Sequence, residues 1–207
     1  MTELNLKAIS RRFNTRKPGA VGRFKRFAVL MPLVEAGGRL NFLFEERARD
    51  LDRQPGEVCF PGGEQEDGET PLMCAVRETM EELGVRRKAI EVIIKADTVY
   101  GSRSSLVSCY LASLDTGGMQ PSAAEVEEVF LVPVSFFMES EPVMGHMTYV
   151  PRDVDDFPNE MIRFPQGYNW MDIEHEVPIY EYGDHVIWGL TGRMIQNFVS
   201  IMKGEKK

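Results

Sequence analysis

Short apolar stretches dominate the chain up to residue 135, and their length and spacing are typical of β-strands. Several alternate apolar and polar residues, and three of the six end just before Gly, Pro or Asp. The glycine pair Gly37-Gly38 separates the first two stretches and predicts a hairpin turn between them. The predicted strands are Phe27–Val34, Leu40–Phe44, Val58–Phe60, Ile90–Tyr100, Leu106–Leu114 and Val129–Val134.

Two other stretches have apolar residues at helical spacing. The first should begin at Thr70-Pro71, since Thr caps free N–H groups and Pro has the backbone angle of a first helical residue. It should end at Gly84, which can adopt the left-handed conformation that often follows a helix. The second covers Ile187–Met202. Strands, a helix, more strands and a closing helix predict an α/β fold with a mixed sheet between helices. The apolar side of the first helix would carry Leu72, Val76, Thr79, Met80 and Leu83.

The polar side of the first helix carries three glutamates. Glu78, Glu81 and Glu82 are related as i, i+3 and i+4, so they should project together. Carboxylates this close repel each other unless a cation lies among them, and hard oxygen ligands suit Mg²⁺ or Mn²⁺. Taken alone, the same residues also fit a solvated surface, with Arg77–Glu81 and Glu82–Arg86 as ordinary helix pairs.

The segment around this helix resembles the Nudix hydrolases, whose signature is G-x5-E-x7-R-E-apolar-x-E-E-x-G-apolar. Thr79 stands where the family usually has an aliphatic residue. The glycine loop and the fixed distance to Glu69 favour a metal site over a solvated surface. The resemblance implies an α/β/α sandwich with a mixed sheet, in which divalent cations assist the hydrolysis of a diphosphate. The matching residues are Gly63, Glu69, Arg77, Glu78, Glu81, Glu82, Gly84 and Val85.

Residue roles follow from the same resemblance. It implies that Glu78, Glu81 and Glu82 are metal ligands, with the Gly63 carbonyl as a further ligand, and that Glu78 and Glu82 are catalytic. It also implies that Glu69 and Arg77 form a structural pair, while Gly84 ends the helix.

Relatives often place another acidic residue after this segment, as a metal ligand or general base. Glu125 is the candidate and Glu128 the reserve. Surface charge is an equal alternative for both residues.

A second motif, directly upstream, resembles the coenzyme A pyrophosphatase branch, L-L-T-x-R-[SA]-x3-R-x3-G-x3-F-P-G-G. Arg47, Ala48, Gly56 and Phe60–Gly63 match it in register. Phe44-Glu45 replaces Leu-Thr, Asp52 takes the place of the second Arg, and Arg53 comes one residue late.

This second resemblance implies cleavage of coenzyme A or acyl-CoA to 4′-phosphopantetheine, or its acyl form, and adenosine 3′,5′-bisphosphate. Arg47 and Arg53 are the candidate substrate-binding residues. ADP-ribose, NADH or a nucleoside triphosphate are alternative substrates. A non-catalytic ligand sensor is the alternative from another class, although sensors of this fold tend to have lost charged residues that are intact here.

We expect one domain over residues 1–207, with two additions. Residues 1–26 form a basic arm, either a solvated helix and linker or an arm that guides phosphate or binds a partner. Residues 138–184 are rich in Pro and aromatic residues and are expected to be an insertion on the substrate side. A small satellite core or a dimer contact is an equal alternative for them. His146, His175 and His185 have no metal-ligand spacing and are interpreted as ordinary polar or core residues.

Composition restricts the partners and the compartment. A net charge of −8 argues against general affinity for nucleic acid or an anionic membrane. The family resemblance implies a small nucleoside-diphosphate substrate as the partner. No apolar run reaches the roughly 18 residues that a membrane helix needs. Three cysteines without metal-ligand spacing suggest reduced thiols in the cytoplasm. The sequence leaves open whether the protein forms a homodimer.

Overall fold

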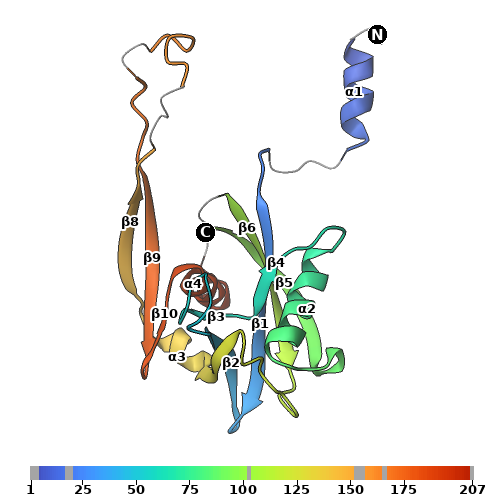
Figure 1. The fold of residues 1–207 in the computed structure, drawn as a ribbon, viewed down its shortest axis with the longest axis vertical. Coiled ribbons are helices and arrows are strands. Elements are labelled where there is room, and N and C mark those ends of the chain that lie inside the picture. The colour runs from blue at the N-terminus through green and yellow to red at the C-terminus, as the bar shows by residue number, and fades with distance from the viewer. Residues whose placement is uncertain (1–4, 17–20, 102–103, 152–156, 165–166, 206–207) are drawn as a thin grey trace.

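The computed structural model describes residues 5–16, 21–101, 104–151, 157–164 and 167–205, and its centre is a mixed seven-stranded sheet (Figure 1). The strand order is β3-β2-β1-β6-β5, with β4 paired to β1 and β7 paired to β2. The pairing of β1 with β6 is parallel, and the other pairings are antiparallel. The strands are β1 (Lys25–Ala36), β2 (Arg39–Arg47), β3 (Val58–Cys59), β4 (Gly62–Glu64), β5 (Ile90–Gly101), β6 (Ser105–Leu114) and β7 (Val126–Pro133).

Helices cover both faces of this sheet, which confirms the predicted sandwich (Figure 1). Helix α2 (Pro71–Glu82) packs on one face, and α3 (Val134–Glu139) and α4 (Gly189–Lys203) lie on the other. A short 3₁₀ helix, η1 (Arg87–Ala89), precedes β5. Two apolar clusters fill the spaces between sheet and helices. One contains Leu30, Leu43 and Leu83 on the α2 side, and the other contains Phe42 and Phe44 on the α4 side.

The local signals around α2 and the first hairpin act as predicted. The hydroxyl of Thr70 accepts a hydrogen bond from the Met73 N–H at 3.3 Å, and Pro71 is the first helical residue. Gly84 follows the helix with a φ of 61°. Gly37 and Gly38 have φ values of 58° and 71°, as the tight turn between β1 and β2 requires.

Several predicted boundaries were wrong because strand pairing extends beyond the apolar residues. Strand β2 continues to Arg47 rather than ending at Phe44. Strand β7 begins at Val126 rather than Val129, since its earlier residues pair with the end of β2. The last helix begins at Gly189 rather than Ile187, because β10 (His185–Ile187) pairs with β9 (Ile173–Tyr182).

Two strands within residues 138–184 form a long hairpin, which was not predicted from the sequence. Strands β8 (Val143–Tyr149) and β9 pair antiparallel and project from the body as an arm (Figure 1). Tyr180 and Tyr182 near its base pack against the main core. Aromatic rings further out contact one another, although three of the four stay exposed: Phe157 with Trp170, Phe164 with Tyr168, and Tyr168 with Trp170.

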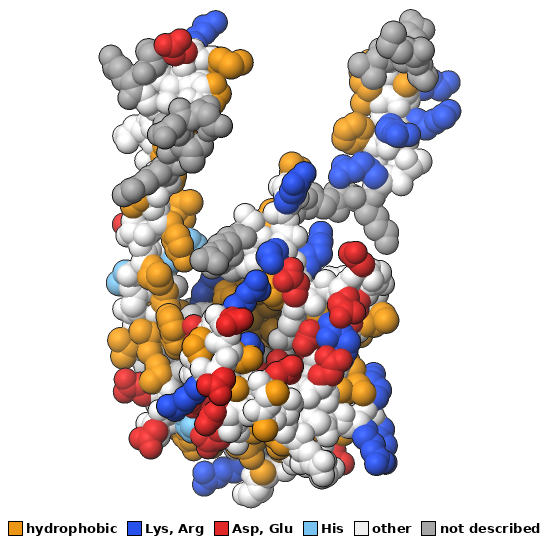
Figure 2. Space-filling view, viewed as in Figure 1, with side chains coloured by type: hydrophobic (Ala, Val, Ile, Leu, Met, Phe, Trp, Pro, Cys, Tyr) orange, Lys and Arg blue, Asp and Glu red, His pale blue; other side chains and the backbone are white. Residues whose placement is uncertain are grey.

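The basic N-terminal stretch contains a helix that stands apart from the body. Helix α1 (Leu6–Asn14) is capped by Asn5, whose side chain accepts from the Ala8 N–H at 3.0 Å, and none of its residues is buried. Figure 2 shows its Lys and Arg side chains away from the acidic side chains that gather over the α2 side. This agrees with a solvated helix. Within the described ranges, no helix has the length and apolar character needed to cross a membrane.

We predict that Phe44→Ala lowers the free energy of unfolding by about 3–5 kcal/mol, the usual cost of removing a buried ring. Phe44 is fully buried and stacks on Phe60 and Phe130, with centroid distances of 4.6 and 5.6 Å. Urea unfolding followed by circular dichroism measures the change. Phe164→Ala on the arm, where the ring is 46% exposed, is the matched control. Equal losses in the two variants would contradict this assignment of the core.

Candidate functional site

A glycine loop holds the start of the site against the edge of β1. Gly62 and Gly63 in β4 pair with Val29 and Ala28. A Cβ at Gly62 would overlap the Ala28 carbonyl, and a Cβ at Gly63 would overlap the Glu78 carboxylate. Only glycine therefore lets the loop, the strand and the α2 carboxylate approach this closely.

Glu78 and Glu82, one helical turn apart, both turn toward this loop. Glu82 is 4% exposed, and its Oε2 accepts a hydrogen bond from the Gly62 N–H at 2.8 Å. Its own backbone carbonyl accepts from the Ser122 N–H at 2.8 Å, which ties the end of α2 to the loop before β7. Glu78 lies against Gly63. Burial raises the pKa of the Glu78 carboxyl above its ordinary value.

Arg77 organises the outer side of the site. Its guanidinium contacts Glu69 at 3.0 Å, Glu78 at 2.9 Å and Glu81 at 3.0 Å. The contact with Glu69 is the predicted pair, and its hydrogen bonds lower the pKa of the Glu69 carboxyl. Arg77 thereby links the loop before the helix to the helix itself.

The three helix glutamates do not share one environment, contrary to the expectation that they project together. The Glu81 side chain is 56% exposed and is held outward by Arg77, whereas Glu82 is turned inward. Glu81 and Glu82 are adjacent and therefore lie about 100° apart around the helix axis, which is enough to put one in solvent and the other in the core.

Glu45 on β2 is a site residue that the sequence reasoning missed. It is 1% exposed, and its Oε1 accepts from the Cys59 thiol at 3.4 Å. Its Oε2 has no hydrogen-bond partner in the part of the chain that the structure describes. Strand alternation could have revealed it. Glu45 follows Leu43 by two residues, so both side chains point to the sheet face that α2 covers.

Buried carboxylates raise each other's pKa at this point. Burial raises the pKa of Glu45 to about 7. Burial, followed by the neighbouring charge of Glu45, raises the pKa of Glu82 to about 9. Such a pair loses free energy on ionisation unless a positive charge compensates it. The unpartnered Glu45 oxygen and the hard carboxylate donors around it fit a divalent cation of the Mg²⁺ or Mn²⁺ type.

Of the other predicted residues, Glu125 and Arg47 lie near these carboxylates, whereas the Arg53 side chain does not. Glu125 is exposed, but its charge acts on both Glu45 and Glu78, so it lies near them. Arg47 lowers the pKa of Glu45 and Glu82 by its charge, and its Nε donates to the Arg53 carbonyl at 3.4 Å. The Arg53 side chain itself is in solvent.

The reserve candidate Glu128 does not join this centre. Glu128 pairs with Glu46 on β2, and the Glu46 side chain points to the opposite face of the sheet from Glu45.

The Gly63 carbonyl, a predicted ligand, accepts from the Cys74 thiol at 3.4 Å and has a second lone pair available.

Comparison with known proteins agrees with this geometry. The model of the NUDIX domain family matches residues 24–148. The peroxisomal coenzyme A diphosphatase NUDT7 of Mus musculus is 38% identical over 118 residues, which cover 56% of this chain and 50% of that protein. The mitochondrial coenzyme A diphosphatase NUDT8 of Homo sapiens is 28% identical over 173 residues, 79% of this chain and 64% of that protein. The chain thus spans half to two thirds of these relatives.

A solved structure shares the fold at low sequence identity. The MutT/nudix family protein from Enterococcus faecalis superposes with a TM-score of 0.52 and 15% identity, covering 98% of this chain and 71% of that one. This likeness supports the fold assignment.

We predict that a divalent cation stabilises the folded chain more strongly as the pH rises. Between the ordinary glutamate pKa of 4.5 and the folded values of about 7 and about 9, folded Glu45 and Glu82 keep protons that the unfolded chain has released. The free energy of unfolding of the metal-free protein should therefore fall as pH rises across this window. A bound cation favours the ionised carboxylates and offsets the loss.

Thermal unfolding in EDTA and in Mn²⁺, from about pH 5 to about pH 9, measures this effect. The Tm difference between the two conditions should grow with pH, and Glu82→Gln should flatten it. A Tm difference that stays constant across this range would contradict the assigned pair.

Proposed function

Because the chain belongs to the Nudix family, we propose that it hydrolyses the diphosphate linkage of coenzyme A or an acyl-CoA with Mg²⁺ or Mn²⁺. The products would be 4′-phosphopantetheine, or its acyl form, and adenosine 3′,5′-bisphosphate. One observation carries the proposal: Glu78 and Glu82 converge on the Gly62-Gly63 loop beside the buried carboxylate of Glu45. This cluster favours a catalyst over a ligand sensor, because mutually buried carboxylates cost stability that simple ligand binding does not require.

Each residue of the site has a proposed task. Glu78, Glu82 and the Gly63 carbonyl would hold the cation, and the Gly62 N–H fixes the orientation of Glu82. When bound, the cation would neutralise charge on the diphosphate and lower the pKa of a water. Glu125 is exposed near the carboxylates and is our candidate for accepting the proton of that water. Arg77 and Glu69 hold the loop and the helix in register.

Glu81 is less suited to bind the cation than Glu78 and Glu82. It is the most exposed of the three helix glutamates, and its carboxylate is already paired with Arg77 at 3.0 Å. The Glu81 carboxylate could contact a cation held by Glu78 and Glu82 only from the solvent-exposed side of that cation.

The proposed substrate rests on the upstream motif and the relatives. NUDT7 and NUDT8 are both named as coenzyme A diphosphatases. Arg47, in register with that motif, lies close enough to Glu45 and Glu82 to act on their pKa values. It could therefore also contact a phosphate bound beside them. Asp52 is exposed on the neighbouring loop, so ADP-ribose, NADH and nucleoside triphosphates stay as alternative substrates.

We propose further that residues 1–207 act as one Nudix domain, with residues 138–184 near the substrate, in the cytoplasm. The names of the relatives include peroxisomal and mitochondrial proteins, so fractionation of expressing cells would test the compartment.

Glu82→Gln should lower kcat by about a hundredfold or more, because it removes a charge that compensates the cation in the transition state. Glu81→Gln removes the same charge one residue away, and it should retain kcat within about tenfold since Glu81 faces solvent. Steady-state rates in saturating Mg²⁺ compare the two variants, with circular dichroism confirming the fold. Similar losses in both would show that the cation is shared equally along the helix.

The substrate is tested by incubating the protein with coenzyme A, dephospho-CoA, ADP-ribose and NADH in Mg²⁺, Mn²⁺ or EDTA, with products identified by mass spectrometry. Coenzyme A should be cleaved only with metal. If Arg47 contacts the 3′-phosphate, kcat/KM for dephospho-CoA should be about ten- to a hundredfold lower. Arg47→Ala should remove most of this difference, while Arg39→Ala, at the exposed first residue of β2, should keep it. Cleavage of ADP-ribose alone would exclude coenzyme A.

A further inference from the structure

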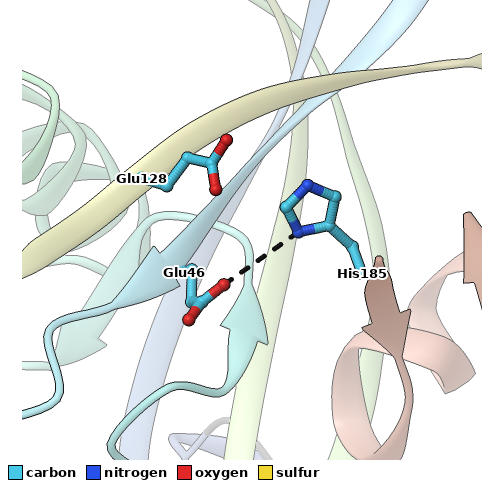
Figure 3. A group of neighbouring side chains, drawn as sticks. All are labelled: Glu46, Glu128 and His185. Carbon is cyan, nitrogen blue, oxygen red and sulfur yellow. Dashed lines mark ion pairs between the residues drawn. The ribbon is translucent and has the colours of Figure 1, made fainter. Parts of the chain in front are cut away.

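Three side chains from distant parts of the sequence meet on the sheet face opposite α2. Glu46 comes from β2, Glu128 from β7 and His185 from β10, and Figure 3 shows the three groups pointing toward one another. One ligand atom from each lies within 4.8 Å of the other two. His185 is the one histidine of the three that approaches two carboxylates in the described residues.

The sheet register separates this group from the α2 carboxylates. Adjacent residues on a strand point to opposite faces, so Glu45 faces α2 while Glu46 faces α4. Glu128 is the cross-strand partner of Glu46, and Phe130 follows it by two residues on the same face. An ion held here would therefore not be the one at the Nudix helix.

Charge favours a cation at this position. Glu46 and Glu128 are directly opposite each other across the β2–β7 ladder, where like charges destabilise a sheet. Arg49 contacts the other oxygen of Glu46 at 3.3 Å, but its side chain is 75% exposed and compensates only weakly. The Nδ1 of His185 is 4.0 Å from Glu46 Oε2, too long for a hydrogen bond. Two ligands of a tetrahedral zinc ion lie about 3.3 Å apart, so the two side chains would have to approach each other by less than about 1 Å to share an ion.

The histidine is held in place before any ion binds. Its ring stacks on Phe130 with a centroid distance of 3.6 Å and an interplanar angle of 5°. Glu46 is half-buried, whereas Glu128 is exposed and free to rotate inward. Because metal–ligand distances are about 2.0–2.2 Å, the three donors must move closer together to share one ion, by small rotations of both the Glu46 and the Glu128 side chain.

We propose that Glu46, Glu128 and His185 form a second metal site, which takes a divalent transition ion such as Zn²⁺ and not Mg²⁺. An imidazole nitrogen with two carboxylates suits Zn²⁺, whereas Mg²⁺ prefers oxygen ligands alone. Solvent completes the coordination. The bound ion links β10, and with it the β8–β9 arm, to β2 and β7 of the main sheet. The inference does not depend on which diphosphate the protein cleaves.

The test is a Zn²⁺ titration of the full chain in excess Mg²⁺, followed by the imidazole ¹⁵N signals of its three histidines. His185 should shift, while His146 and His175, which lie on the β8–β9 arm, should not. Glu128→Gln should weaken the Zn²⁺ affinity at least about tenfold, the effect of losing one ligand. Glu127→Gln removes the same charge from the next residue and should leave the affinity unchanged. Both glutamates are exposed, so neither variant should lose its fold.

Three results would overturn the proposal. The His185 signal could stay fixed through the titration, which would make the group an ordinary Glu46–His185 ion pair. All three histidines could shift together, which would indicate non-specific binding. Glu127→Gln could weaken binding as much as Glu128→Gln, which would indicate general attraction by acidic residues. Because the readout needs no turnover, these results are independent of the proposed hydrolase activity.

Discussion

The site depends on one costly feature, the burial of Glu45 and Glu82 beside each other between the sheet and α2. Each carboxylate disfavours the ionisation of the other, and one oxygen of Glu45 has no partner among the described residues. The unfavourable free energy of burying two such groups is offset where a bound ligand compensates their charge. The Gly62 N–H and the Ser122 N–H hold Glu82 in place, the Cys59 thiol contacts Glu45, and Arg77 joins α2 to the loop before it.

Successive side chains of β2 point to opposite faces of the sheet, so this strand places a carboxylate on each face. Leu43 and Glu45 face α2, while Phe44 and Glu46 face the side of α4. Because two neighbouring glutamates occupy the end of this strand, a one-residue shift in its register would exchange their environments. The antiparallel pairing of β2 with β1 and β7 therefore positions both groups of acidic residues.

The sequence predicted what local signals determine. Thr70 and Pro71 predicted the first residue of α2, Gly84 predicted its end to within two residues, and Gly37-Gly38 predicted the hairpin, because caps and turns depend on near neighbours. The β8–β9 hairpin was missed because its strands pair across an intervening segment of more than twenty residues. The burial of Glu45, the outward turn of Glu81 and the contact of His185 with Glu46 depend on tertiary packing and strand register, which a single sequence does not reveal.

The most direct measurement is a crystal structure of the protein grown with Mn²⁺, with the ion located by its anomalous scattering. The account predicts a peak at about 2.0–2.4 Å from carboxylate oxygens of Glu78 and Glu82, beside the Gly63 carbonyl. Glu45 should lie next to it, with its unpartnered oxygen turned to the ion or to a water on the ion. A well-ordered α2 with no Mn²⁺ peak at these glutamates would contradict the account.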